Sequence, residues 1–313
     1  MCVMKLTTKG LCSVINFLQR VGAKLLSLLA FALNDKCYLK CLYLIHMGKV
    51  LDLRNPVTYN EKLNWLKLYD RKLSYIQLVD KYHVKDYVAS VVGKEYLIPT
   101  IGVWDDPKDI DWGVLPHQFV LKTTHGGGNT GVIICKDKSK INKEDIVRKL
   151  KKSLKQNLYL YSREWVYKGV TPRIIAEPYL EDLKTEELRD YKFFCFNGEV
   201  KMLFVASARQ KRSEPYFDFF DSDYNPLPII QGHPNSDVQP EKPQRFEEMK
   251  AIAAKLSKEM PTLRVDLYEV NGKVYFGELT FYHFGGVVPF VPEKWDYILG
   301  DYINLPEKKD SYK

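Results

Sequence analysis

The spacing of apolar residues divides the chain into a helical first third and a mixed remainder. In several segments apolar side chains recur every three or four positions, which is typical of amphipathic helices. We expect helices over 36–50, 54–70, 75–92, 141–160 and 243–260. The second of these carries a start signal, because Thr58 and Glu61 have the T-x-x-E spacing of a capping box.

From residue 118 the pattern changes to short runs rich in β-branched and aromatic residues. We expect strands over 118–124, 131–135, 173–176, 191–196 and 199–205, and a last hairpin over 263–280. Asn197-Gly198 and Asn271-Gly272 are hairpin turn signals. Helices first, then mixed strands and helices, predict an α+β fold. The expected divisions are an N-terminal amphipathic helix, a helical region, a core and a polar tail, over 1–35, 36–115, 116–300 and 301–313.

Residues 11–33 form an apolar stretch that is long enough to cross a bilayer. Asn16, Gln19, Arg20 and Lys24 interrupt it, and two central cations make spanning costly. Basic residues before the apolar run suit a signal peptide, but no clear small-x-small cleavage site follows. We favour an amphipathic helix docked on the main domain; a helix on a membrane surface and a true anchor or signal stay open. A chain that starts near residue 36 is expected to keep nucleotide binding.

Composition narrows the class of protein. The chain has 313 residues, of which 45% are hydrophobic and 27% charged, and this excludes collagen-like, low-complexity and wholly disordered proteins. The formal net charge is +8, but basic residues interleave with acidic ones, so no nucleic-acid partner is expected. The six cysteines form no C-x-x-C pair, which disfavours a zinc site and fits a reducing cytoplasm.

A glycine loop between two expected strands is the most informative segment. Its glycines let backbone amides approach phosphate oxygens, and Lys122 adds a positive charge beside them. The loop residues expected to bind a nucleotide are Gly126, Gly127, Gly128 and Asn129. A dinucleotide fingerprint would need a helix after the loop, and the Walker and protein-kinase motifs are missing from the sequence. The loop therefore predicts a hairpin lid over a triphosphate, with a ligand-free flexible hairpin as the alternative.

Further charged residues lie on both sides of this loop in the sequence, in short stretches that occur in a fixed order. The stretches that contain them are NPVTYNEKLNWLKLYDR, DKYHVKDYV, LKTTHGGGNTG, AEPYL, DYKFFCFNGEV and GELTFYHFGG. Taken together they resemble the ATP-grasp superfamily, and more closely its TupA-like branch, which is associated with bacterial cell-surface polymer biosynthesis. The resemblance runs from about Tyr38 to Pro292.

The resemblance implies an ATP-grasp fold in which two α+β subdomains hold ATP between them, after a helical N-terminal region. It implies phosphate contacts from Lys81 and Lys122, and adenine and ribose contacts around Glu177. It also implies that Asp266, Glu278 and Thr280 bind Mg²⁺. Lys192 would contact the γ-phosphate. Thr280 stands where many members have Asn. From its place after a strand, Arg209 is expected to bind an acidic acceptor or the transferred phosphoryl group.

The activity that the resemblance implies is an ATP-dependent carboxylate–amine ligase. ATP phosphorylates a carboxylate to an acylphosphate, and an amine then attacks; the carboxylate and the amine belong to small molecules or polymer ends. A cytoplasmic enzyme is expected, with membrane contact through residues 11–33 left open. The rival is a glycosyltransferase whose D-x-D is Asp221-Ser222-Asp223, although the following residues read as a turn and no early run of alternating parallel strands and helices is present.

Strand parity gives a geometric prediction for the metal site. Side chains alternate faces along a strand, so a two-residue Asn271-Gly272 turn would place Asp266 and Glu278 on opposite faces. A three-residue loop that includes Val270 would place them on one face as diagonal neighbours. We therefore expect an odd-length loop and a shared face. We also expect Lys122→Ala to weaken stabilisation by ATP while leaving the stability of the nucleotide-free protein nearly unchanged.

Overall fold

The chain folds around two antiparallel β-sheets. The computed structural model describes residues 8–127, 131–209, 212 and 214–308, with side chains from residue 18 onward. The smaller sheet has the order β1-β4-β2-β3, formed by Gly102–Trp104, Ile174–Pro178, Phe119–Thr123 and Val132–Cys135. The larger sheet has the order β10-β9-β5-β6-β7-β8, formed by Lys273–Thr280, Leu263–Val270, Asp190–Phe196, Glu199–Ser207, Tyr216–Asp221 and Pro226–Leu227. Every strand pairing in the described residues is antiparallel, so the expected α+β class is confirmed.

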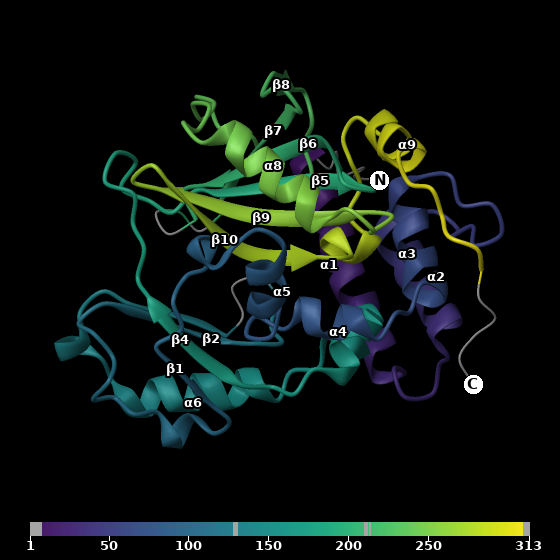
Figure 1. The fold of residues 1–313 in the computed structure, drawn as a ribbon. Helices are drawn as coiled ribbons and strands as arrows, with labels where there is room; N and C mark the ends of the chain where they lie inside the picture. Colours follow the sequence, from purple (N-terminus) through teal and green to yellow (C-terminus); the bar gives the residue numbers. More distant parts are fainter. Residues whose placement is uncertain (1–7, 128–130, 210–211, 213, 309–313) are drawn as a thin grey trace.

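Helices cover both sheets and extend to one side of them (Figure 1). The α-helices are α1 Thr8–Leu28, α2 Asp35–Met47, α3 Tyr59–Tyr69, α4 Ser74–Val79, α5 Val84–Val91, α6 Lys143–Leu154, α7 Leu158–Ser162, α8 Phe246–Leu256 and α9 Lys294–Asp301. Short 3₁₀ turns are η1 Lys94–Tyr96, η2 Pro107–Asp109, η3 Lys138–Lys140, η4 Trp165–Gly169 and η5 His283–Gly286. The capping box of α3 is confirmed: the Glu61 amide donates to Thr58 Oγ1 at 3.2 Å, and the Thr58 amide donates to Glu61 Oε2 at 3.0 Å.

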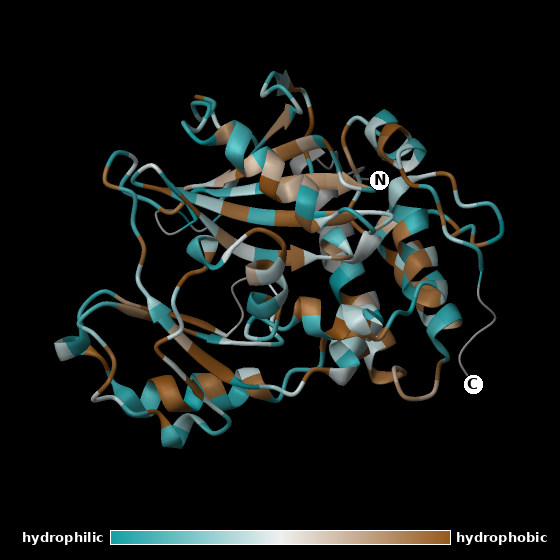
Figure 2. Ribbon diagram, in the orientation of Figure 1, coloured by the Kyte–Doolittle hydropathy of each residue, from teal (hydrophilic) through white to brown (hydrophobic). Residues whose placement is uncertain are grey.

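Each sheet has its own hydrophobic core. In the smaller one Leu121 of β2 packs against Ile146 and Leu150 of α6. Figure 2 shows the corresponding alternation of apolar and polar positions along α6, which lies on the side of this sheet away from the larger one. In the core of the larger sheet, α8 packs across β5, β6 and β9, and Phe193 and Met249 are fully buried. Helices α4 and α5 lie between the two sheets (Figure 1).

Two expected helices are each broken in two. The segment 75–92 forms α4 and α5, because Asp80 is extended and its carboxylate accepts from the amides of Tyr82 and His83 at 2.8 and 2.9 Å. Such local side-chain bonds compete with helical ones. The segment 141–160 is likewise divided, because α6 ends at Leu154 and a second helix, α7, begins at Leu158. The side chain of Asn157 caps α7 by accepting from the Leu160 amide.

Helix α1 is docked on α2, as the favoured interpretation of the N-terminal stretch predicted. Leu26 and Ala30 are buried against Tyr38 and Leu42. None of the described helices has both the length and the apolarity needed to cross a membrane. The division between a helical region and the core stays a prediction, and β1 joins the region expected to be helical to the smaller sheet.

Candidate functional site

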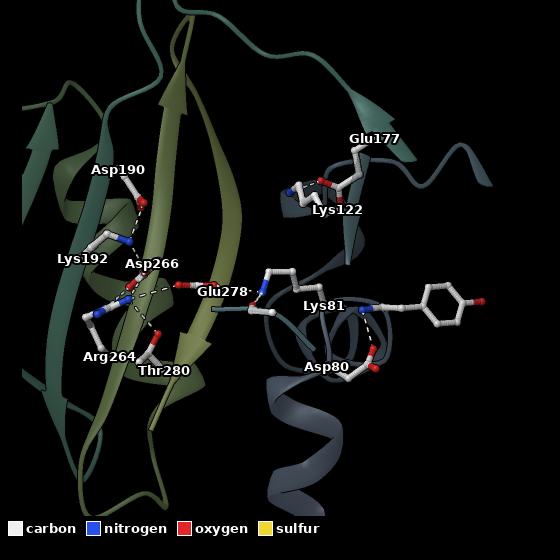
Figure 3. A network of polar contacts seen from close by, with 12 residues as sticks. Asp80, Lys81, Lys122, Glu177, Asp190, Lys192, Arg264, Asp266, Glu278 and Thr280 are labelled. Carbon is white, nitrogen blue, oxygen red and sulfur yellow. Dashed lines mark hydrogen bonds and ion pairs between the residues drawn. The ribbon is translucent and has the colours of Figure 1, made fainter. Parts of the chain in front are cut away.

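Six polar and charged side chains share one face of the larger sheet. Alternation along each strand puts residues two apart on the same face, and register puts paired residues there too. Lys192 pairs with Asp266, Asp266 pairs with Glu278, and Arg264 pairs with Thr280. Asp190, two residues before Lys192, completes the set. Figure 3 shows this group gathered on β5, β9 and β10, and we call it the carboxylate cluster: Asp190, Lys192, Arg264, Asp266, Glu278 and Thr280.

The shared face of Asp266 and Glu278 is confirmed, but the predicted odd-length loop is wrong. Val270 pairs with Lys273 across a two-residue Asn271-Gly272 turn. Both turn residues have positive φ, 51° and 76°, as a type I′ turn requires. The register is corrected further along, where Gly277 forms a bulge between Phe276 and Glu278. One extra residue moves Glu278 directly opposite Asp266, so the two carboxylates are direct rather than diagonal neighbours.

Asp266 is held by two cations and has no exposed surface. Arg264 binds it through two parallel contacts, Nε to Oδ1 and Nη2 to Oδ2, each 2.7 Å long. Lys192 forms a short contact with the same Oδ2 and lies 2.6 Å from Asp190 Oδ2. Burial raises the pKa of Asp266 above its ordinary value, although Arg264 and Lys192 oppose that shift. Arg264 therefore sets the position of this carboxylate, a role that sequence reasoning missed.

Glu278 is the accessible carboxylate of the cluster, with 29% of its side chain exposed. Its Oε1 lies 3.3 Å from Arg264 Nη2, and its Oε2 lies 3.5 Å from Lys81 Nζ. Burial by itself would raise the pKa of Glu278, but Lys81, Lys192 and Arg264 outweigh burial and hold that pKa well below its usual range. Thr280 accepts from Arg264 Nη2 at 2.9 Å, so its hydroxyl is engaged by this guanidinium.

Lys81 connects the carboxylate cluster to the glycine loop. The break at Asp80 turns the chain so that the Lys81 amide donates to the carbonyl of Thr124 at 3.1 Å. The Lys81 ammonium donates to the carbonyl of Gly126 in a short bond and faces Glu278 on the larger sheet (Figure 3). One lysine thus contacts both the glycine loop and the larger sheet.

The glycine loop has the expected strands on either side. Strands β2 and β3 pair without interruption, from Phe119 opposite Cys135 to Lys122 opposite Val132. Gly131 closes the loop at φ +79°, and a Cβ there would clash with the hydroxyls of Thr123 and Ser153. Gly126 and Gly127 are described, whereas Gly128 and Asn129 lie outside the described residues.

Lys122 and Glu177 lie together on the smaller sheet, apart from the carboxylate cluster (Figure 3). Lys122 Nζ is 2.5 Å from Glu177 Oε2, an ion pair without hydrogen-bond geometry. Lys85 of α5 hydrogen-bonds to the other oxygen at 2.7 Å. Burial acts to raise the pKa of Glu177, but Lys122 and Lys85 more than offset it and leave the pKa lowered. Lys85 was not predicted; its spacing of four residues from Lys81 was the available signal.

Arg209 joins the carboxylate cluster from the end of β6. Its Nη1 lies 2.9 Å from Asp190 Oδ2, and 29% of its side chain is exposed. His125, which directly precedes the glycines of the loop, has a structural partner. The ring of His125 bonds to the carbonyl of Gln156 at 3.2 Å, and burial lowers its pKa.

The D-x-D segment forms a turn after β7. Asp221 accepts from the amides of Asp223 and Asn225 at 2.9 and 2.8 Å, and from the Asn225 side chain at 2.9 Å. Its carboxylate is therefore used within the turn. This favours the turn interpretation over a nucleotide-sugar site.

The oxygen donors of the carboxylate cluster fit a hard cation such as Mg²⁺. Asp190 Oδ1 is buried without a hydrogen-bond partner, and Glu278 offers accessible oxygens beside Asp266. Within the described ranges, no group of three His, Cys, Asp or Glu side chains has a preformed metal geometry. Arg264 contacts both oxygens of Asp266 and Lys192 contacts Oδ2 as well, so a metal would meet Asp266 at Oδ1, or at Oδ2 once Lys192 moves.

Comparisons with known proteins give one family and several distant structures. A family model described as TupA-like ATPgrasp matches residues 61–304. No curated protein matches the sequence. A D-alanine–D-alanine ligase from Bacillus anthracis is similar over 72% of this chain and 66% of its own, with 14% identity and a TM-score of 0.42. An L-amino acid ligase from Bacillus licheniformis is similar over 76% of this chain and 51% of its own, with 14% identity and a TM-score of 0.45.

A third similar structure is the D-cycloserine synthetase DcsG, with 16% identity and a TM-score of 0.40 over 72% of this chain and 69% of its own. The chain thus spans about half to two thirds of the length of these proteins. A likeness this distant assigns no activity to the chain.

Proposed function

Because the chain belongs to the TupA-like ATP-grasp family, we propose that it is an ATP- and Mg²⁺-dependent carboxylate–amine ligase of bacterial surface polysaccharide biosynthesis. The observation that carries the proposal is the position of Lys81. It contacts the glycine loop of one sheet and faces the carboxylate cluster of the other. A triphosphate between the sheets would meet a cation and backbone amides from one side and metal-binding carboxylates from the other.

Each cation near the site then has a role in binding phosphate. Lys81 leaves the Glu278 contact, which is the longest of its contacts at 3.5 Å, to meet a phosphate oxygen. Lys192 faces the γ-phosphate from the larger sheet, and Lys122 reaches phosphate when it separates from Glu177. Glu278 and Asp266 would hold Mg²⁺, which neutralises phosphate charge when bound. Thr280 is engaged by Arg264 and serves chiefly to orient that guanidinium.

The reaction transfers the terminal phosphoryl group of ATP to a carboxylate oxygen of the substrate and releases ADP. An amine then attacks the acylphosphate carbon, the C–O bond to phosphate breaks, and an amide and phosphate result. Arg209, which is partly exposed beside Asp190, would bind the incoming carboxylate. The carboxylate and the amine belong to small molecules or polymer ends. A cytoplasmic location fits both ATP supply and the free thiols of Cys37, Cys41, Cys135 and Cys195.

ADP release tests this proposal. The full chain is incubated with ATP, Mg²⁺ and pairs of candidate carboxylates and amines, and ADP is measured by a coupled assay. Glu278→Gln and Asp266→Asn should abolish turnover nearly completely. Glu199→Gln, which changes an exposed glutamate on β6 of the same sheet, is the matched control and should retain it.

Nucleotide choice separates the ligase from the glycosyltransferase. Stabilisation by ATP with Mg²⁺, and none by uridine or guanosine diphosphate sugars, supports the ligase. The reverse preference would refute it and would return attention to Asp221. The contacts of Asp221 within its turn argue for the first result.

A further inference from the structure

Helix α1 and the turn after it expose a row of large apolar side chains. Spacings of three and four residues place the helical members on one side. They are Leu18, Val21, Leu25 and Leu28, which are 60, 41, 59 and 72% exposed, followed by Leu29 and Phe31 at 54 and 87%. We call these six residues the α1 row. Nothing in the described part of the chain covers them, and a contiguous apolar surface of this kind marks a contact with another apolar phase.

The opposite side of α1 is fixed to the rest of the molecule. Gln19 Nε2 donates to the carbonyl of His46 in α2 at 3.0 Å, and Leu26 is buried against α2. Beyond the helix, the guanidinium of Arg163 donates to the carbonyl of Leu33 at 3.2 Å and to that of Ala30 in a short bond. The helix is therefore held with the α1 row pointing outward. Leaving this row exposed brings no packing gain to the fold.

The charge of the segment indicates what covers the row. The first 34 residues contain Lys5, Lys9, Arg20 and Lys24 and no acidic residue. Arg20 and Lys24 are exposed on α1 beside the row. A second copy of the chain would bring the same positive segment against this one, so charge opposes self-association through the row. An anionic lipid surface supplies both an apolar phase and negative charge.

We propose that α1 lies in the plane of an anionic membrane surface, with the α1 row at the boundary between headgroups and acyl chains and with Arg20 and Lys24 at the lipid phosphates. The helix is not apolar enough to cross the bilayer, which fits an in-plane position. This inference does not depend on the ligase activity.

Vesicle sedimentation of the full chain tests the inference. Leu25→Glu with Leu28→Glu removes two members of the row without touching α2, and should weaken binding to phosphatidylcholine–phosphatidylglycerol vesicles by at least about tenfold. The matched control is Leu73→Glu with Leu183→Glu, two leucines that are 76 and 81% exposed elsewhere, and it should bind as the wild type does. Point variants are preferable to removal of residues 1–35, which would uncover Tyr38 and Leu42.

The charge component has its own variant. Arg20→Gln with Lys24→Gln should weaken binding to the anionic vesicles, and added salt should reduce the difference between this variant and the wild type. Vesicles of pure phosphatidylcholine should bind the wild type more weakly than the anionic ones. Melting temperatures, with and without ATP, show that each variant is folded and keep this test separate from any failure of the ligase proposal.

Three results would overturn the inference. The first is sedimentation of the wild type at the background level with either vesicle. The second is binding of the Leu25/Leu28 variant as tight as that of the wild type. The third is a dimer in light scattering that the same variant dissociates, which would make a second copy the occupant of the row.

Discussion

Replacing Lys122 with alanine should destabilise the nucleotide-free protein, contrary to the expectation from sequence. In the sequence Lys122 lies at the end of an expected strand, just before the glycine loop, and is expected to be a free phosphate ligand. In the structure it is 2.5 Å from Glu177, which is only 3% exposed. Removing the lysine leaves a buried carboxylate with Lys85 as its remaining cation.

The size of the effect follows from this arrangement. Removing one partner of a buried ion pair costs about 3–5 kcal/mol when the other charge is left unpaired. Here Lys85 still hydrogen-bonds to one oxygen, and Lys122 itself is 18% exposed, so we expect a loss of about 2 kcal/mol. For a chain of this length that corresponds to a fall in melting temperature of roughly 3 °C.

Urea unfolding of four proteins measures the contribution: the wild type, Lys122→Ala, Glu177→Gln and the double variant. Because the two side chains interact, the double variant should be more stable than the sum of the single losses predicts, by about 1 kcal/mol or more. Lys140→Ala is the matched control, since Lys140 is 82% exposed and its ion pair with Asp137 is worth at most about 1 kcal/mol. Equal stability of Lys122→Ala and the wild type, or additive single effects, would refute the buried pair. The same variant should also lose part of the stabilisation by ATP.

Three further predictions concern residues of the two sheets. Gly277→Val should lower both the stability of the protein and its stabilisation by ATP, because the new Cβ would lie 3.0 Å from the carbonyl oxygen of Asp266. Deletion of Gly277 leaves Glu278 opposite Asp266, so thermal melts should show that this variant keeps more of the stabilisation by ATP. Glu177 has a pKa below its ordinary 4.5, so its stabilisation is complete above pH 4.5 and is lost as pH falls through the folded-state value; urea unfolding between about pH 3 and pH 7 should show a flatter acid side for Glu177→Gln. His283 Nδ1 accepts from Arg264 Nη1 at 2.7 Å, so His283→Ala should lower the free energy of unfolding by about 1–3 kcal/mol. It should also lower kcat more than it changes KM for ATP, and His283→Asn should recover part of the loss. Unchanged kinetics would contradict a role of His283 in orienting Arg264.

Features that depend on neighbours in the chain could be predicted from sequence. The capping box of α3 and the two Asn-Gly turns rest on bonds within a few residues, and both turns have the positive φ values that Asn and Gly tolerate. The strands on either side of the glycine loop also came from local pattern. So did the docked α1, because its buried and exposed positions alternate with helical spacing.

Features that depend on strand register or on residues distant in the chain could not be predicted from sequence. The bulge at Gly277 was missed, because a glycine inside a strand does not by itself reveal a change of register. The pairing of Lys122 with Glu177 joins residues 55 positions apart, and Lys85 reaches them from a helix. The break at Asp80 was missed because an acidic residue fits a helix pattern as well as a turn. Yet that break is what brings Lys81 to the glycine loop.

Each carboxylate of the carboxylate cluster is paired with a cation, and the order in which these contacts can open follows from burial and distance. Asp266 is fully buried and gripped through both oxygens, so it should be the last to exchange partners. Glu278 is partly exposed and lies 3.5 Å from Lys81, so this contact should open first. Lys81 would not drift away when it opens, because its amide remains bonded to the carbonyl of Thr124. A phosphate group could therefore attract the Lys81 ammonium away from Glu278 while the backbone hydrogen bond keeps the lysine in place. The Glu278 carboxylate would then lose its contact with Lys81 when a metal–nucleotide complex binds.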